Sequence, residues 1–309
     1  MDELEGLVEF RIPLADVPKG LNLIAGLTGF ADSGAAVSQM ADYVLDTMDS
    51  QVVAVFNPDA LLDYRARRPT IYFDQDHLTG YEPPMLAIHL VRDELARPFM
   101  FLTGYEPDFK WEAFSRVLIK LVDLLDVKLT TWVHAIPMPV PHTRPIGCTV
   151  SGTNREVVQQ KSVWRPHTQV PSNAMHLVEY RLQESGHQVV GFVLLVPHYL
   201  ADTEYPITAV VALEQVSSLT GLIFATDRLR DEGREFTQKI DAQVESNEEL
   251  GKLVATLEER YDSYMRDNAV AGVVTDESNL PSADEIASEL EDFLAAHRSS
   301  EESGDGFPQ

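Results

Sequence analysis

The chain has 309 residues, 44 % of them hydrophobic and 24 % charged, a composition typical of globular proteins that excludes wholesale disorder. Its 49 acidic residues outnumber 24 basic ones, and the net charge of −25 at pH 7 disfavours binding to nucleic acid or to anionic membrane surfaces. The single cysteine, Cys148, excludes an internal disulfide framework and CxxC metal or redox motifs.

The N-terminal part of the chain predicts a strand, a helix and a second strand. LNLIAGL (21–27) and QVVAVF (51–56) are continuous apolar runs of strand length, and between them apolar residues recur at helical spacing from Ala36 to Met48. Asp32 or Ser33, in the glycine-bearing turn 28–34, is the expected N-cap of this helix. Continuous apolar strands flanking a helix indicate a parallel sheet covered on both faces.

The same alternation continues to residue 226. Strands are predicted at 85–91, 99–104, 128–136, near 146–151 and at 189–196, and helices at 110–125, 173–185 and 207–219. Asp108 is the expected N-cap of the second of the four helices, Gly221 closes the last one, and a polar loop occupies the segment to about 171. We therefore predict an α/β core domain over residues 1–226, a mostly parallel sheet sandwiched by helices.

The C-terminal quarter predicts an acidic helical subdomain over residues 227–309. It holds 22 acidic and 8 basic residues. Residues 228–266 show helical apolar periodicity, 269–281 form a linker, and the capping box SADE (282–285) begins a further helix. The polar tail is expected to fray from about 298.

No run in the sequence approaches the roughly 18 apolar residues of a membrane-spanning helix, and the acidic N-terminus MDELEGLVEF does not resemble a secretory signal. We therefore expect a cytoplasmic protein.

Several candidate functional residues directly follow predicted strands. In α/β sheets, ligands bind at the carboxyl ends of the parallel strands. The turn 28–34 does not match a phosphate-binding glycine loop, because its glycines have the wrong spacing and no lysine follows. Ser33 is flanked two residues away by Ala31 and Ala35 instead of glycines, so it does not sit in a nucleophile elbow. Asp32 and Ser33 stay candidates for a ligand or partner surface only.

Three loops carry a histidine directly after a proline, at His142, His167 and His198. Histidine at a strand end is suited to act as a general base or as a metal ligand, but it equally satisfies loop carbonyls and amides in a structural role. The histidines lack the spacing of a metal site. The candidate ligand or partner surface consists of residues from the turn 28–34, from these loops and from the corner after strand 99–104: Asp32, Ser33, Tyr105, Glu106, His142, Thr143, Arg144, His198 and Tyr199.

Cys148 is the only nucleophile candidate, and a lone cysteine is more often a small core hydrophobe. The sequence assigns no catalytic residue and no metal ligand, and we expect no cofactor. Arg65, Arg67 and Arg68 form the one dense basic group, which is more typical of a solvated loop than of an anion site.

Six segments together resemble the proteasome assembly chaperone 2 family, and more narrowly its actinobacterial branch. They are GFADSGAA (29–36), LTGYEPDFKWEAF (102–114), IPMPVPHTRP (136–145), VPHYLADTEYP (196–206), QKIDAQVESNEELGKLVATLEERYD (238–262) and LPSADEIASELEDFLAAH (280–297). The resemblance implies an α/β core similar to nucleoside phosphorylases, without an inherited active site, followed by C-terminal helices. It also implies self-association, and a role like that of the eukaryotic namesake, which helps to assemble the α-ring of the 20S proteasome.

Two functions remain open at this point. The first is a non-enzymatic protein-interaction or assembly factor, whose partners are a second copy of the chain (a homo-oligomer) and proteasome subunits. The alternative is a small-molecule-binding protein, or a hydrolase- or phosphorylase-like enzyme, that uses the loops at the carboxyl edge of the sheet. The resemblance and the absence of a catalytic signature favour the first.

Overall fold

The apolar runs form the centre of one eight-stranded sheet in the computed structural model, which describes residues 6–165 and 167–270. The strand order is β1-β3-β6-β7-β2-β8-β10-β9. The neighbouring strands β7 (Pro98–Tyr105), β2 (Asn22–Thr28), β8 (Leu129–Met138) and β10 (Val189–Pro197) are parallel. Because they are covered on both faces, these strands are apolar along most of their length.

Antiparallel strands complete the sheet on both sides of this centre. β3 (Ser50–Phe56) and β6 (Leu86–Arg92) continue it toward the edge strand β1 (Val8–Phe10), and β9 (Cys148–Gly152) forms the opposite edge. β2 and β3 run in the same direction, as predicted, but β7 and β6 lie between them. The prediction of a mostly parallel sheet is confirmed, since β3 and the four central strands share one direction.

Helices cover both faces of the sheet, as predicted. α1 (Ala36–Thr47) and α6 (Pro206–Thr220) pack together on one face, and α3 (Trp111–Leu125) and α5 (Ala174–Glu184) pack together on the other. Successive residues of the central strands alternate between the two cores: Ile24 of β2 contributes to the first, and Leu23 and Ala25 contribute to the second.

The short helical segments lack a buried stripe and carried little sequence signal. They are α2 (Pro58–Leu61), α4 (Arg155–Lys161) and the 3₁₀ turns Leu14–Asp16, Ser33–Ala35 and His198–Leu200. The prediction of an unbroken polar loop up to about 171 was wrong, because α4 lies within it. Its Asn154 N-cap accepts a hydrogen bond from the backbone N of Val157, but α4 buries no residue and so shows no apolar periodicity.

The acidic helical region predicted at 228–266 consists of two helices, α7 (Asp227–Ser246) and α8 (Glu248–Val270). Asn247 separates them, and its side chain accepts hydrogen bonds from the backbone N atoms of Glu249 and Leu250, which starts a new helix. The first half of α7 packs on α6: Gly233 lies so close to Ile207 that an added Cβ would come within 2.4 Å of its side chain.

The predicted linker begins inside α8. The rest of that linker, the helix expected from 282 and the tail from 298 lie outside the described residues. The division into domains 1–226 and 227–309 stays a prediction.

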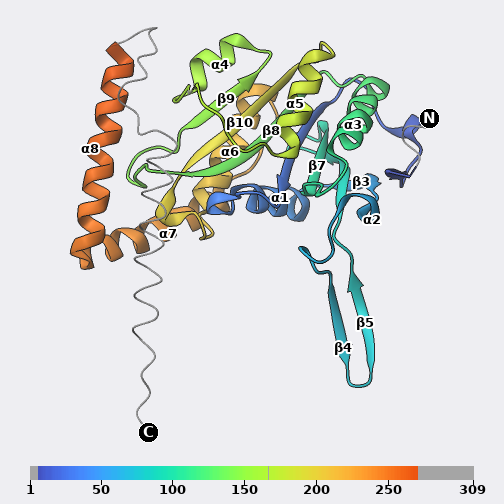
Figure 1. Ribbon diagram of the computed structural model, residues 1–309, viewed down its shortest axis with the longest axis horizontal. Helices are drawn as coiled ribbons and strands as arrows, with labels where there is room; N and C mark the ends of the chain where they lie inside the picture. The colour runs from blue at the N-terminus through green and yellow to red at the C-terminus, as the bar shows by residue number, and fades with distance from the viewer. Residues whose placement is uncertain (1–5, 166, 271–309) are drawn as a thin grey trace.

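A hairpin that the sequence analysis did not predict projects from the body of the molecule (Figure 1). It consists of β4 (Thr70–Asp74) and β5 (His77–Glu82), which pair only with each other, and every residue of both strands is exposed. Five large apolar side chains of the hairpin are between 46 % and 73 % exposed: Ile71, Tyr72, Phe73, Leu78 and Tyr81. We call residues 70–82 the arm.

No helix within the described residues combines the length and the apolarity needed to cross a membrane.

Candidate functional site

The loops singled out from the sequence meet at one edge of the sheet. β2, β7, β8 and β10 are parallel, so their carboxyl ends, at Thr28, Tyr105, Met138 and Pro197, face the same side. The prediction of a shared carboxyl edge is therefore correct. The residues on it are engaged in three separate groups.

The first group lies at the start of α1. The carboxylate of Asp32 accepts hydrogen bonds from the backbone N atoms of Val37 (2.7 Å) and Ser38 (2.9 Å) and from Ser38 Oγ (2.7 Å). Ser33 is buried. Gly34 has a φ of 68°, and a Cβ added to it would lie 2.8 Å from the methyl carbon of Thr208. The N-cap of α1 is Ala35, not Asp32 or Ser33 as predicted, but the Asp32 carboxylate still accepts hydrogen bonds from two backbone N–H groups of the first turn, and its negative charge stands where a phosphate would have to bind.

The second group surrounds Tyr105 and Glu106. The guanidinium of Arg67 lies 5.2 Å from the centre of the Tyr105 ring and forms an ion pair with Asp108. The other carboxylate oxygen of Asp108 accepts a hydrogen bond from the backbone N of Asp63. Asp108 therefore anchors the segment that leads to the arm.

The prediction that Asp108 caps α3 was wrong. The N-cap of α3 is Lys110, in the left-handed conformation, because the side chain of Asp108 is already used by Arg67 and Asp63.

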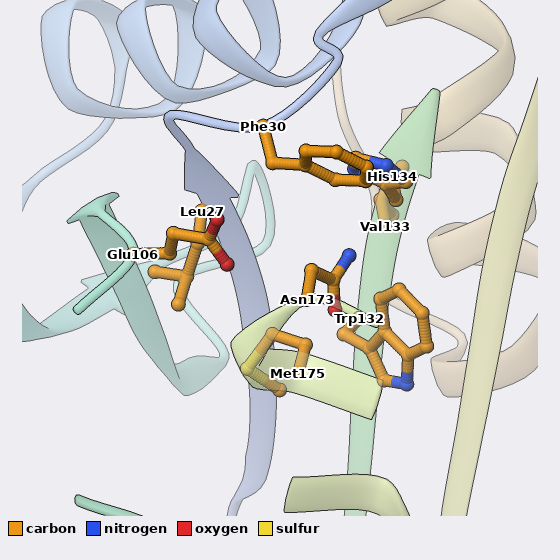
Figure 2. A pocket seen from close by; sticks show the side chains of 8 residues that line it. All are labelled: Leu27, Phe30, Glu106, Trp132, Val133, His134, Asn173 and Met175. Carbon is orange, nitrogen blue, oxygen red and sulfur yellow. The ribbon is translucent and has the colours of Figure 1, made fainter. Parts of the chain in front are cut away.

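Glu106 lines a pocket at the carboxyl end of β2, beside the middle of β8 (Figure 2). Its Oε2 accepts a hydrogen bond of 2.9 Å from the backbone N of Ala174, at the start of α5. Burial raises the pKa of Glu106, and the hydrogen bond from Ala174 opposes this rise. Leu27, Val133, Trp132 and Met175 supply the apolar walls of the pocket.

Three residues that the sequence analysis missed complete the pocket. His134, on β8, is 3 % exposed, and its Nε2 has no hydrogen-bond partner among the described residues. Burial lowers the pKa of His134 to about 4, so the ring is neutral at pH 7. Asn173 is the N-cap of α5, and its Oδ1 accepts a hydrogen bond from the backbone N of His176. Phe30 covers the pocket with its ring parallel to that of His134.

A buried carboxyl beneath the pocket holds Trp132 in place. Glu179 Oε2 accepts hydrogen bonds from Trp132 Nε1 (2.7 Å) and Ser151 Oγ (2.9 Å), and Oε1 accepts one from Gln183 Nε2 (2.9 Å). Burial raises the pKa of Glu179, against the lowering effect of these three hydrogen bonds. Because all of its partners belong to the fold itself, Glu179 supports the pocket wall.

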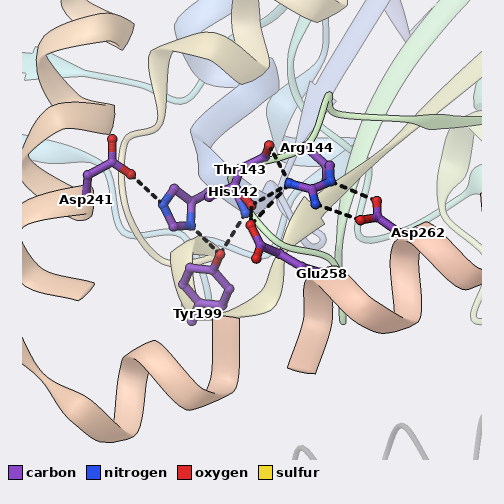
Figure 3. A network of polar contacts seen from close by, with 7 residues as sticks. All are labelled: His142, Thr143, Arg144, Tyr199, Asp241, Glu258 and Asp262. Atoms are coloured by element: carbon purple, nitrogen blue, oxygen red, sulfur yellow. Dashed lines mark hydrogen bonds and ion pairs between the residues drawn. The ribbon is translucent and has the colours of Figure 1, made fainter. Parts of the chain in front are cut away.

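The third group ties the loop after β8 to the C-terminal helices (Figure 3). The hydroxyl of Tyr199 accepts a hydrogen bond from the backbone N of His142 (2.7 Å), and it lies 2.6 Å from His142 Nδ1. Because the carboxylate of Asp241 only accepts hydrogen bonds, its contact places a proton on Nε2, and with Nε2 protonated Nδ1 accepts the proton of the Tyr199 hydroxyl. This Nε2–H donates to Asp241 of α7 at 3.1 Å. Burial raises the pKa of Tyr199, so the hydroxyl remains a donor.

The neighbouring residues reach α8. Arg144 donates to both carboxylate oxygens of Asp262 (2.8 and 2.7 Å) and to Glu258 (3.1 Å), and Thr143 donates to the same Glu258. The hydrogen bond from Arg144 lowers the pKa of Asp262. His142, Thr143, Arg144 and Tyr199 thus hold α7 and α8 on the core.

The remaining candidates are accounted for as follows. The ring of His198 packs edge to face against Tyr199, 5.5 Å away, and His167 is exposed. Cys148 is buried, and burial raises its pKa to about 11, so its thiol is protonated at neutral pH and is a poor nucleophile. Among the residues that the structure describes, no three His, Cys, Asp or Glu side chains are placed to share a metal ion.

Comparison with known proteins gives a family match over most of the chain. The profile of the PAC2 family matches residues 26–244. A protein of unknown function from Mycobacterium tuberculosis is 39 % identical, with a TM-score of 0.78 over 85 % of this chain and 93 % of its own. A protein of unknown function from Corynebacterium glutamicum is 31 % identical, with a TM-score of 0.79 over 84 % and 98 %.

A third solved structure shares the fold at lower identity. It is a proteasome-assembly chaperone homologue from Mycobacterium tuberculosis, 20 % identical, with a TM-score of 0.69 over 76 % of this chain and 100 % of its own. No relative was found among proteins of curated function.

Proposed function

The chain belongs to the PAC2 family, and on that premise we propose that it is a non-enzymatic assembly factor that acts through protein–protein contacts, with proteasome α-subunits as its clients. The fold shared with a proteasome-assembly chaperone homologue supports this choice of client. The observation that carries the proposal is the arm, an apolar element of the chain that lies outside both cores.

The arm is built for contact with another protein chain. Phe73 is 73 % exposed and Leu78 is 60 % exposed, and these two residues face each other across the hairpin. A two-stranded hairpin is at best marginally stable alone in water, so a covering partner stabilises it. Clustered exposed apolar side chains on a globular protein mark such interaction sites.

The partner that we propose for the arm is a second copy of the chain. Because every copy of the chain carries an arm, an arm and its proposed partner are always present at equal concentrations. The exposed Arg65 and Arg68, at the base of the arm, are complementary to another molecule with a net charge of −25. In this proposal the homo-oligomer is the form that acts on α-subunits.

The charged contacts of the candidate surface support a structural role for its histidine loop. The side chain of His142 is hydrogen-bonded to Asp241 of α7, and that of Arg144 to Asp262 of α8. Both side chains are therefore already paired with carboxylates of the protein itself. This arrangement favours the assembly role over an enzyme that uses these loops.

An assembly assay tests the function. Purified proteasome α-subunits are mixed with the chain, and the rate of ring formation is followed by native mass spectrometry. The chain should accelerate ring formation. The double variant Phe73→Thr/Leu78→Thr should not, because threonine keeps the strand propensity but removes the apolar surface.

The matched control is Tyr180→Gln, which removes a 56 % exposed aromatic ring from α5 on the body. It should act like the wild type. Light scattering on the same samples should give a multiple of 34.5 kDa for the wild type and 34.5 kDa for the arm variant. Equal ring formation with and without the chain would reject the function, and a wild-type monomer would reject the role of the arm.

A further inference from the structure

The pairing of β4 with β5 divides the side chains of the arm between its two faces (Figure 1). Phe73 pairs with Leu78, so these two side chains lie on one face. Since side chains alternate along a strand, the adjacent pairs lie on the opposite face: Tyr72 with Thr79, and Asp74 with His77. The arm is therefore a ribbon whose two faces differ in composition.

A bulge in β5 brings a further large side chain to the face of Phe73. Between two consecutive pairs β5 has one residue more than β4, and Gly80, with a φ of 59°, takes the left-handed conformation typical of a glycine bulge. Beyond the bulge Glu82 pairs with Thr70 on the polar face, so its neighbour Tyr81 lies on the face of Phe73. We call that side of the arm the apolar face; it consists of Ile71, Phe73, Leu78 and Tyr81.

The charged groups of the arm lie away from the apolar face. Asp74 and Glu82 lie on the polar face beside His77, and Asp76 lies in the turn between the strands. The four side chains of the apolar face carry no charge and are between 46 % and 73 % exposed. Two molecules that each carry a net charge of −25 repel one another, so they associate most readily where no carboxylates meet. On the arm, that place is the apolar face.

Packing of one apolar face on another covers all four of its side chains. Pairing of two arms along their edges would instead leave both apolar faces in water, and the bulge at Gly80 interrupts the edge of β5 that such pairing needs. Two apolar faces together hold on the order of 1,000 Å² of exposed surface, which is the lower limit for a specific interface between proteins. Two arms are therefore large enough to hold two chains together reversibly.

We infer that the arms of two chains pack face to face, with the apolar face of one arm on the apolar face of the other. Because each arm has a single apolar face, the contact is symmetric and closed, and it produces a dimer. The inference rests on the proposed self-association through the arm, and it adds which face is buried and how many chains associate.

Two tyrosines on opposite faces provide a matched test. Tyr81 is 55 % exposed on the apolar face, and Tyr72 is 57 % exposed on the polar face. In sedimentation equilibrium the wild type should reach twice 34.5 kDa. Tyr81→Thr should raise the Kd of the dimer at least about tenfold, because the dimer loses two buried rings. Tyr72→Thr should leave the Kd unchanged.

Cross-linking maps the contact without removing an aromatic ring. Leu78→Cys and Thr79→Cys place a thiol on neighbouring exposed residues of β5 that point to opposite faces. The native Cys148 is buried, so it contributes no background. At a concentration at which the wild type is a dimer, a short bismaleimide should link Leu78→Cys into a covalent dimer and should leave Thr79→Cys unlinked.

The outcomes separate the face from the self-association itself. If the wild type is oligomeric, then equal effects of the two tyrosine variants, equal linking of the two thiols, or a trimer would each overturn the face-to-face dimer and leave self-association standing. A monomeric wild type would reject both.

Discussion

Replacing His142 by alanine tests whether the loop after β8 is a structural clamp or a ligand site. The imidazole is 2 % exposed and bridges Tyr199 and Asp241. In His142→Ala the hydroxyl of Tyr199 still accepts a hydrogen bond from the backbone N–H of residue 142. It loses Nδ1, the acceptor for its own proton. A buried donor left unpaired costs about 1–3 kcal/mol.

The lost contact with Asp241 adds little to this cost, because that carboxylate is 51 % exposed and water replaces the imidazole. The expected loss of unfolding free energy is therefore about 1–3 kcal/mol. At about 2–4 °C per kcal/mol, the melting temperature should fall by several degrees in a scanning fluorimetry or calorimetry experiment.

A double-mutant cycle identifies the contact responsible. Tyr199→Phe should cost a similar amount, and the double variant should cost less than the sum of the two by about 1 kcal/mol, because each single change already breaks the same bond. His167→Ala, at an exposed histidine, is the control and should stay within about 0.5 kcal/mol of the wild type. An unchanged stability of His142→Ala, or strict additivity, would refute the clamp and revive the ligand interpretation.

Three further predictions concern the interior. The pKa of His134 is near 4 in the folded chain and near 6.5 when unfolded, so the unfolded state gains a proton first on acidification. The wild type should therefore lose about 3 kcal/mol more than His134→Phe between pH 7 and pH 4, as measured by urea unfolding at both pH values. Gly191→Ala should cost about 1–3 kcal/mol, since the added Cβ would lie 2.4 Å from the Trp132 ring and disturb its bond to Glu179; unchanged near-ultraviolet dichroism and stability would contradict this. Cys148 should resist iodoacetamide at pH 7.5 in the folded protein and react only after denaturation, and fast native alkylation would show an accessible thiol.

The sheet and its helices could be predicted because their residues are buried. The runs that became β2, β8 and β10 are apolar on both faces, and the stripes of α1 and α3 follow helical spacing. The order of the strands could not be predicted, because no local sequence pattern indicates that β7 and β6 lie between β2 and β3. The arm was missed for a related reason: its strands contact neither core, and their mixture of polar and apolar residues follows no single pattern.

The candidate site was predicted in part. Glu106 was found because it follows a strand end, and His142 because it follows a proline in a strand-end loop. His134 lies inside an apolar strand that was assigned to the core, although a histidine in such a run is itself a signal. Arg144 pairs with Glu258 and Asp262, which lie more than a hundred residues away in the chain. Only the tertiary structure could bring these residues together.

The central claim is that the chain self-associates through its arm and that the resulting homo-oligomer binds proteasome α-subunits. Affinity purification of the tagged chain from its host lysate, with quantitative mass spectrometry of the retained proteins, tests this most directly. We predict that proteasome α-subunits are recovered in amounts comparable to the wild-type chain and are lost with Phe73→Thr/Leu78→Thr. Recovery of the chain alone, or equal recovery of α-subunits with both forms, would contradict the claim.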